Sequence, residues 1–164
     1  MKRAAYIALG ANQGDTRDTF AAALDSLASL EQSELVAVSP YYRTAPIDAE
    51  GPDYLNAVAR LDTRLEPYAL LLHLLELELM LGRKRHGVKR NAPRSVDLDL
   101  LLHGDLCIQS TPLTLPHPRA HLRAFVLRPL ADIEPELVIP GRGRVIDLLA
   151  QVADQRIEAV TPLS

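Results

Sequence analysis

The chain has 164 residues, a length that suits one domain built around one core. Hydrophobic residues make up 48% of it and charged residues 24%, as in an ordinary soluble globular protein. The formal charge of −3 provides no general attraction to nucleic acid or to an anionic membrane, so neither is expected as a partner. The single cysteine, Cys107, excludes an intramolecular disulfide, favours a reducing compartment and is expected to be a small buried hydrophobe.

The apolar stretches do not predict insertion into a membrane. Residues 4–9 form too short a run for a signal peptide. The densest apolar stretch, residues 69–81, contains His73, Glu76 and Glu78 and therefore cannot span a bilayer. We expect the protein to be cytoplasmic.

The first half of the chain predicts strands that alternate with helices. Residues 4–9 predict a buried strand that ends at Gly10, and Asp15 or Thr16 can cap a helix extending to about residue 30. Residues 35–42 predict a second strand, and residues 54–61 alternate as a strand with one face in the core. Pro67 suits the first position of a helix that Gly82 is expected to end.

The second half predicts a basic loop over residues 83–95, a strand over 96–102 and a turn at 103–105. After Pro118 a helical stretch is expected, and the tail from about Val145 predicts one more short helix. The order β-α-β-β-α-β followed by an extension is typical of a split βαβ arrangement. We therefore expect an α+β fold in which helices cover one face of an antiparallel-rich sheet.

A pair of acidic residues carries the clearest chemical signal. In a strand, Asp97 and Asp99 point to the same face with Cα atoms roughly 6.6 Å apart, while Val96, Leu98 and Leu100 point into the core. A divalent cation would relieve their mutual repulsion, and Mg²⁺ suits a site with one or two carboxylates plus substrate phosphates. The alternative is an edge strand that carries charge to prevent edge pairing.

The basic loop directly before this pair favours the metal interpretation. Six of the 18 Lys and Arg residues lie within 12 positions, with no acidic residue among them: Arg83, Lys84, Arg85, Lys89, Arg90 and Arg94. Guanidinium groups and a metal ion together suit a polyphosphate, and we expect the loop to be mobile and to close over it. The alternatives are a solvated loop or a nucleic-acid patch, and the absence of an aromatic residue between positions 83 and 94 counts against binding to a single strand.

No nucleotide-binding glycine motif is present, so side chains and metal would have to hold any triphosphate. His117 lies between Pro116 and Pro118, which makes its backbone stiff, and its ring can donate to a phosphate oxygen. Taken alone, this segment would be interpreted as a structural turn. It is followed by Arg123 and Phe125.

These motifs together resemble the 6-hydroxymethyl-7,8-dihydropterin pyrophosphokinases, from Ala5 to about Pro140. The matching segments are Tyr6-Ile7-Ala8-Leu9-Gly10-Ala11-Asn12, Tyr42-Arg43-Thr44-Ala45-Pro46, Tyr54-Leu55-Asn56, Gly82-Arg83, Ala92-Pro93-Arg94-Ser95-Val96-Asp97-Leu98-Asp99, and Pro116-His117-Pro118 with Arg123 and Phe125. Each segment alone is modest evidence, whereas the ordered set is highly specific.

The resemblance implies that residues 1–164 form a single pterin pyrophosphokinase domain with a ferredoxin-like fold. It implies transfer of diphosphate from ATP to 6-hydroxymethyl-7,8-dihydropterin, with AMP as the other product, in folate biosynthesis. Asp97 and Asp99 would hold two Mg²⁺ ions. The expected ATP-binding residues are Glu78, Arg83, Arg85, Arg94, His117 and Arg123, and the expected pterin-binding residues are Thr44, Ala45, Pro46, Ile47, Tyr54, Asn56 and Phe125. Arg83, Arg85 and Arg94 would join the Asp pair as catalytic residues.

The sequence departs from many members of this family at Leu75, and from some members at Asn91 and Pro118. Two other functions stay open. One is another two-metal enzyme such as a nucleotidyl transferase, which would not need the set of Tyr54, Asn56 and Phe125. The other is an RNA-binding module, which would need surface aromatics on a basic sheet. Because no second apolar face is predicted, the protein is expected to be a monomer.

Overall fold

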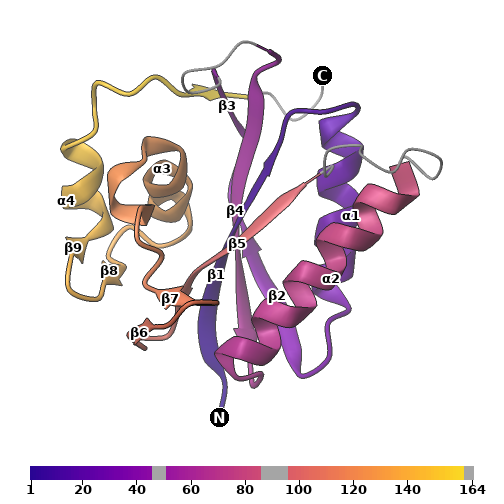
Figure 1. Cartoon of the computed structure of the whole chain (residues 1–164). Coiled ribbons are helices and arrows are strands. Elements are labelled where there is room, and N and C mark those ends of the chain that lie inside the picture. The colour runs from indigo at the N-terminus through magenta and orange to yellow at the C-terminus, as the bar shows by residue number, and fades with distance from the viewer. Residues whose placement is uncertain (46–50, 86–95, 161–164) are drawn as a thin grey trace.

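The computed structural model describes residues 1–45, 51–85 and 96–160, except the side chains of residues 83–85. The strands in these residues are β1 (Arg3–Ala11), β2 (Ser33–Val38), β3 (Tyr42–Thr44), β4 (Tyr54–Thr63), β5 (Asp97–His103), β6 (Ile108–Gln109), β7 (Thr114–Leu115), β8 (Val138–Ile139), β9 (Gly143–Arg144) and β10 (Glu158–Ala159). The helices are α1 (Thr16–Ala28), α2 (Pro67–Arg85), α3 (Ala124–Ile133) and α4 (Val145–Ala150), with a short 3-10 helix, η1 (Ala120–Leu122). The protein is thus α+β, as expected (Figure 1).

The main sheet has the order β10-β3-β4-β1-β5, and β2 also pairs with β4. Every pairing among the described strands is antiparallel. The single strand predicted over residues 35–42 is wrong, because β2 pairs with the second half of β4 whereas β3 pairs with its first three residues. Pro40 lies at the break, where its missing N–H cannot continue a ladder.

Helices cover both faces of the sheet, so the expectation of helices on one face is wrong. The first core packs α1 and α2 against one face and includes Phe20, Leu61 and Leu74. The second core packs α3 and α4 against the other face and includes Val58 and Leu127. Figure 1 shows α1 and α2 on one side of the sheet and α3 and α4 on the other. Residues 55–59 of β4 are therefore all buried, and simple alternation fails there.

Local chemistry explains where the two long helices begin. The Asp15 carboxylate accepts a hydrogen bond from the Asp18 N–H at 3.1 Å, which confirms the predicted cap of α1. Helix α2 begins at Pro67, as predicted, but it continues past Gly82 to Arg85. A glycine within a helix costs only about 1 kcal/mol, and basic residues in the last turn favour the negative end of the helix dipole. Part of the expected basic loop is therefore helical.

Among the described helices, none is long and apolar enough to cross a membrane. Cys107 is exposed, so the expectation that it is buried is wrong: it lies on the short segment between β5 and β6, where its Sγ donates to the Asp105 carbonyl at 3.9 Å. The predicted strand before residue 103 and the two predicted C-terminal helices are confirmed.

Candidate functional site

A row of three cross-strand neighbours lies at the end of the sheet where β1 finishes. Gly10 in the central strand is opposite Asn56 of β4 and opposite Asp97 of β5. Side chains of directly opposite residues share a face of the sheet, so Asn56 and Asp97 lie on either side of a glycine that has none. The next row on this face places Ala8 opposite Asp99. Small residues on β1 therefore leave a hollow between the amide and the two carboxylates.

The two aspartates are exposed, whereas Leu98 and Leu100 between and after them are buried in the first core. This confirms the predicted division of β5 into two faces. The backbone N–H of Leu98 donates to Glu78 Oε2 at 2.7 Å. Glu78 is only 4% exposed, so α2 holds the peptide between the two aspartates by a buried, charge-assisted hydrogen bond.

A first hollow of about 290 Å³ lies over this row of residues. Ala8 and Gly10 line its floor, and Asp97, Asp99 and Arg123 line it as well. Its remaining described walls include Thr44, Ala45, Tyr54, Asn56 and Phe125, all of which the sequence predicted as pterin-binding residues. The structure therefore brings together residues from four distant parts of the chain.

The polar wall of this hollow is preorganised. Asn56 is buried, and its Nδ2 donates to Thr44 Oγ1 at 2.8 Å. Its Oδ1 would lie 3.8 Å from a Cβ atom added at Gly10, so the amide oxygen is turned toward the floor of the hollow. A fixed amide with its oxygen available suits a ligand that presents N–H groups.

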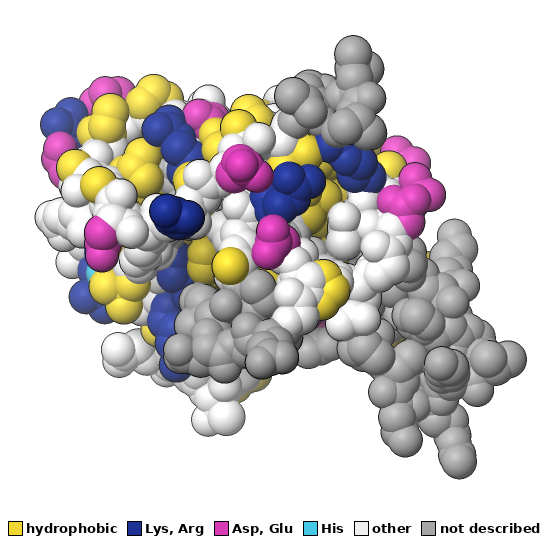
Figure 2. Space-filling view, turned by 90° about the horizontal axis from the view of Figure 1, so that it is seen from above, with side chains coloured by type: hydrophobic (Ala, Val, Ile, Leu, Met, Phe, Trp, Pro, Cys, Tyr) yellow, Lys and Arg dark blue, Asp and Glu magenta, His cyan; other side chains and the backbone are white. Residues whose placement is uncertain are grey.

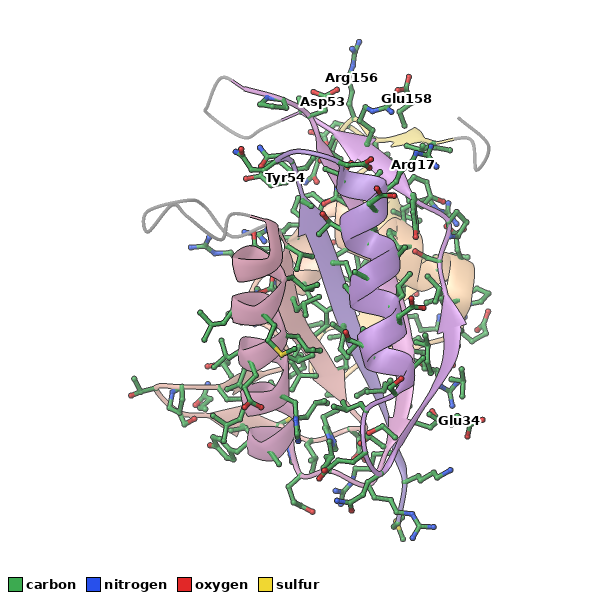
Figure 3. All side chains as sticks on the ribbon, turned by 90° about the vertical axis from the view of Figure 1, so that its right-hand side faces the viewer. Arg17, Glu34, Asp53, Tyr54, Arg156 and Glu158 are labelled. Carbon is green, nitrogen blue, oxygen red and sulfur yellow. The ribbon has the colours of Figure 1, made fainter. Side chains whose placement is uncertain are left out.

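The aromatic wall carries a positive charge. The Arg123 Cζ lies 5.4 Å from the centre of the Phe125 ring, within the range of a cation–π interaction. Phe125 is partly buried against the second core and also lines the hollow, so it is not simply a core residue. Tyr54, the first residue of β4, lines the same hollow and is labelled in Figure 3.

A second hollow of about 350 Å³ lies on the outer side of β5 and also includes Asp97 and Asp99. Glu78 and His117 line it, together with Leu75. The Asp pair therefore lies where two hollows meet. Such a junction suits an ion that must contact two different substrates.

His117 is held by its own backbone. The ring Nδ1 of His117 accepts a hydrogen bond from the Arg119 backbone N–H at 3.1 Å, and the backbone N–H of His117 donates to the Leu101 carbonyl at 2.9 Å. Burial lowers the pKa of the imidazole; the Asp99 carboxylate acts in the opposite direction, and the nearby arginines Arg123 and Arg119 add to the decrease. The neutral ring therefore carries its proton on Nε2, which can donate to an anion.

The donor set fits magnesium better than a softer metal. Among the described residues, no group of three or more His, Cys, Asp or Glu side chains could hold an ion without help. The two adjacent carboxylates provide only oxygen atoms, and Mg²⁺ typically completes such a shell with water and substrate phosphates. The residues present thus fit a magnesium ion that binds together with a phosphorylated substrate.

Several predicted residues lie outside the described part of the chain. Pro46, Ile47 and Arg94 are among them, as are residues 86–95 of the loop that was expected to close over the site. Arg83 and Arg85 belong to α2, but their side chains are not described. Conversely, Ala8 and Gly10 line the first hollow without having been predicted to do so. Their signal was the spacing of two small residues, Ala8 and Gly10, which lie two positions apart and therefore share a face of the strand.

Seen from this end of the molecule, Lys and Arg side chains are interspersed with Asp and Glu side chains over the described surface (Figure 2). The described part of the surface in this view therefore carries charges of both signs.

Comparison with known proteins agrees with these features. The model of the family "7,8-dihydro-6-hydroxymethylpterin-pyrophosphokinase (HPPK)" matches residues 6–135. A 2-amino-4-hydroxy-6-hydroxymethyldihydropteridine pyrophosphokinase of Haemophilus influenzae is 39% identical over 96% of this chain and 98% of its own length. The protein of the same name from Pseudomonas aeruginosa is 43% identical over 93% of this chain and 94% of its own.

A solved structure of Plasmodium falciparum HPPK-DHPS superposes with a TM-score of 0.74 and 14% identity, over 94% of this chain and 46% of that one. The chain thus spans less than half of that solved protein, and a likeness at this identity shows the fold alone. The family model and the two bacterial relatives decide the assignment, and the chain belongs to the 7,8-dihydro-6-hydroxymethylpterin-pyrophosphokinase family.

Proposed function

We propose that the chain transfers the diphosphoryl group of ATP to the hydroxymethyl oxygen of 6-hydroxymethyl-7,8-dihydropterin, at the junction of the two hollows. Pyrophosphokinase activity in folate biosynthesis follows from membership of the family. The observation that best supports this location is that Asp97 and Asp99 line both hollows at once. An acceptor in one hollow and a triphosphate in the other would meet at these two carboxylates.

The first hollow is the proposed pterin site. Tyr54 and Phe125 provide aromatic surface for a flat ring, and stacking on such surface contributes about 1–3 kcal/mol per base in nucleic acids. Asn56 and Thr44, with Ala45 beside them, would read the polar edge of the ring. Pro46 and Ile47 complete this proposed set from the sequence alone.

The second hollow and its rim form the proposed triphosphate site. Its proposed ligands are Glu78, Arg83, Arg85, Arg94, His117 and Arg123. Two of them have a described role that fits: the His117 Nε2–H can donate to a phosphate oxygen, and Glu78 holds the Leu98 peptide between the aspartates. Glu78 would therefore act by positioning Asp97 and Asp99 as well as by lining the nucleotide site.

Asp97 and Asp99 are the proposed ligands of two Mg²⁺ ions, and bound magnesium would neutralise the charge of the triphosphate. The protein's own contribution would be to align the pterin oxygen with the β-phosphorus and to exclude water by covering the site. Arg123 adds positive charge between the aromatic wall and the Asp pair. No described side chain needs to act as a general base in this scheme.

Incubation with ATP, Mg²⁺ and 6-hydroxymethyl-7,8-dihydropterin tests the proposal directly. We expect one AMP for each pterin diphosphate formed, and no AMP without the pterin. Release of ADP, or turnover of a nucleoside acceptor in place of the pterin, would contradict it.

The finer description of the fold belongs to the same proposal. The strand order, with β1 between β4 and β5, supports a ferredoxin-like split βαβ arrangement. One sheet carries both cores, which supports a single domain over residues 1–164. We also propose that the protein is a cytoplasmic monomer, and light scattering tests its oligomeric state. If the protein dimerises, the face of α2 that carries the exposed side chains of Leu72 and Leu79 is the surface to examine.

A further inference from the structure

The side chain of Gln155 bridges two backbone groups far away in the sequence. Its Oε1 accepts from the Ala124 N–H at 2.8 Å, and its Nε2 donates to the Leu122 carbonyl at 2.9 Å. These two groups lie on either side of Arg123. One amide side chain therefore holds the backbone immediately before and after that residue.

This bridge occurs where the chain turns from η1 into α3. Arg123 has an extended backbone, with φ −124° and ψ 121°, and is the N-cap of α3 without a capping hydrogen bond from its own side chain. The first N–H groups of a helix have no partner within the helix, and Gln155 supplies one for Ala124 from a different segment. The direction in which α3 leaves this turn decides where Arg123 and Phe125 point.

The segment that carries Gln155 also reaches the opposite wall of the first hollow. Strand β10 pairs with β3, with Glu158 opposite Arg43, and the Val160 N–H donates to the Tyr41 carbonyl at 2.9 Å. Strand β3 ends at Thr44, which lines the hollow and receives the hydrogen bond of Asn56. Figure 3 shows Arg156 and Glu158 of this segment at the same end of the molecule as Tyr54.

Residues 155–160 therefore connect the aromatic wall to the polar wall from outside the hollow. This segment also lies beyond residues 6–135, which the family model matches. We propose that Gln155 is a positioning residue for pterin recognition, acting through the backbone of Arg123 and the ring of Phe125. The inference rests on the proposed function, because it assumes that Phe125 contacts the pterin.

A double-mutant cycle between Gln155 and Phe125 tests it, with pterin and ATP dissociation constants and the melting temperature measured for each full-length variant. Gln155→Met keeps the length of the side chain but removes both hydrogen bonds, and we expect it to weaken pterin binding about tenfold. In a Phe125→Ala background the same change should weaken it less than about twofold, because the ring that Gln155 positions is gone. A purely structural role would give the same loss in both backgrounds.

Two further variants complete the test. Gln155→Glu keeps an acceptor for the Ala124 N–H, but its second carboxylate oxygen cannot donate to the Leu122 carbonyl and repels it, so this variant should also weaken pterin binding. Gln151→Met is the matched control, since Gln151 is exposed at the end of α4 and should leave pterin binding unchanged.

The outcomes separate this inference from the proposed function. Loss of pterin binding in Phe125→Ala together with wild-type binding in both Gln155 variants would overturn the positioning role and leave the function intact. Unchanged binding in Phe125→Ala itself would overturn the proposed pterin site. Equal losses from Gln155→Met in both backgrounds would also reject the positioning role.

Discussion

Removing the Glu78 carboxylate should destabilise the protein and loosen the proposed metal site at the same time. In Glu78→Ala the Leu98 N–H loses the acceptor that lies 2.7 Å away, inside a region where both residues are only 4% exposed. A buried donor left without a partner costs about 1–3 kcal/mol, and the bond to a carboxylate places this case in the upper half of that range. For a chain of this length, about 2 kcal/mol corresponds to a decrease in melting temperature of about 4–8 °C.

The same change should alter activity because the Leu98 peptide lies between Asp97 and Asp99. Without its anchor to α2, this part of β5 can shift, and we expect the Mg²⁺ concentration that gives half-maximal turnover to increase. Thermal unfolding and a Mg²⁺ titration at saturating ATP and pterin measure the two effects. Glu78→Gln retains an acceptor oxygen and should lose less of both.

Glu76→Ala provides the matched control, since Glu76 lies two residues earlier on α2 with a side chain that is 70% exposed. It should shift the melting temperature by less than about 2 °C. If Glu78→Ala has the melting temperature of wild type and reaches half-maximal turnover at the same Mg²⁺ concentration, the role assigned to the Glu78–Leu98 hydrogen bond is refuted.

Three other predictions concern the site and the second core. Asp97→Asn or Asp99→Asn should lower turnover by about 100-fold or more, because a proposed metal ligand is lost, and wild-type turnover with Mg²⁺ would reject the metal assignment. Asp99→Asn should also melt no earlier than wild type in metal-free buffer, because the repulsion between the two carboxylates is relieved. Gly10→Val adds a branched side chain to the floor of the first hollow and should raise the KM for the pterin far more than that for ATP, whereas an equal rise in both would reject this assignment of the hollow. Burial, with the nearby Glu134 carboxylate, raises the pKa of Tyr6 to about 12, so the folded state retains this proton more tightly than the unfolded state. The stability that this shift contributes is complete below about pH 10 and is lost as the pH rises toward 12. The melting temperature of wild type relative to Tyr6→Phe should therefore decrease across that window, with Tyr68→Phe at an exposed tyrosine as the control. A difference in melting temperature that does not change with pH would contradict this link between Tyr6 ionisation and stability.

Patterns that depend on neighbours in the chain were readable from the sequence. The cap at Asp15 and the start of α2 at Pro67 follow from local hydrogen-bonding and backbone rules, and both are confirmed. The exposed faces of Asp97 and Asp99 follow from the period of two in a strand and are confirmed as well. The ordered motifs were specific enough to indicate the family, and the comparisons confirm it.

Features that depend on long-range packing could not be read in this way. Periodicity alone did not predict that α3 would cover the second face of the sheet, because an apolar helix such as residues 124–133 carries no mark of the surface it will meet. The continuation of α2 past Gly82 was missed because a single glycine costs less than a helix gains from continued hydrogen bonding and a favourable dipole.

Only the tertiary structure decided how the site is assembled. The register of three antiparallel strands places Asn56, Gly10 and Asp97 side by side, although 87 positions separate the last two in the chain. A one-residue shift of that register would turn each side chain to the other face of the sheet. The sequence by itself determined which chemical groups the chain carries and which face of a strand presents them. Only the pairing of distant strands, supported by the contacts of α2 and Gln155, determined which of these groups meet. The reason is that cross-strand contacts depend on register and packing rather than on local pattern.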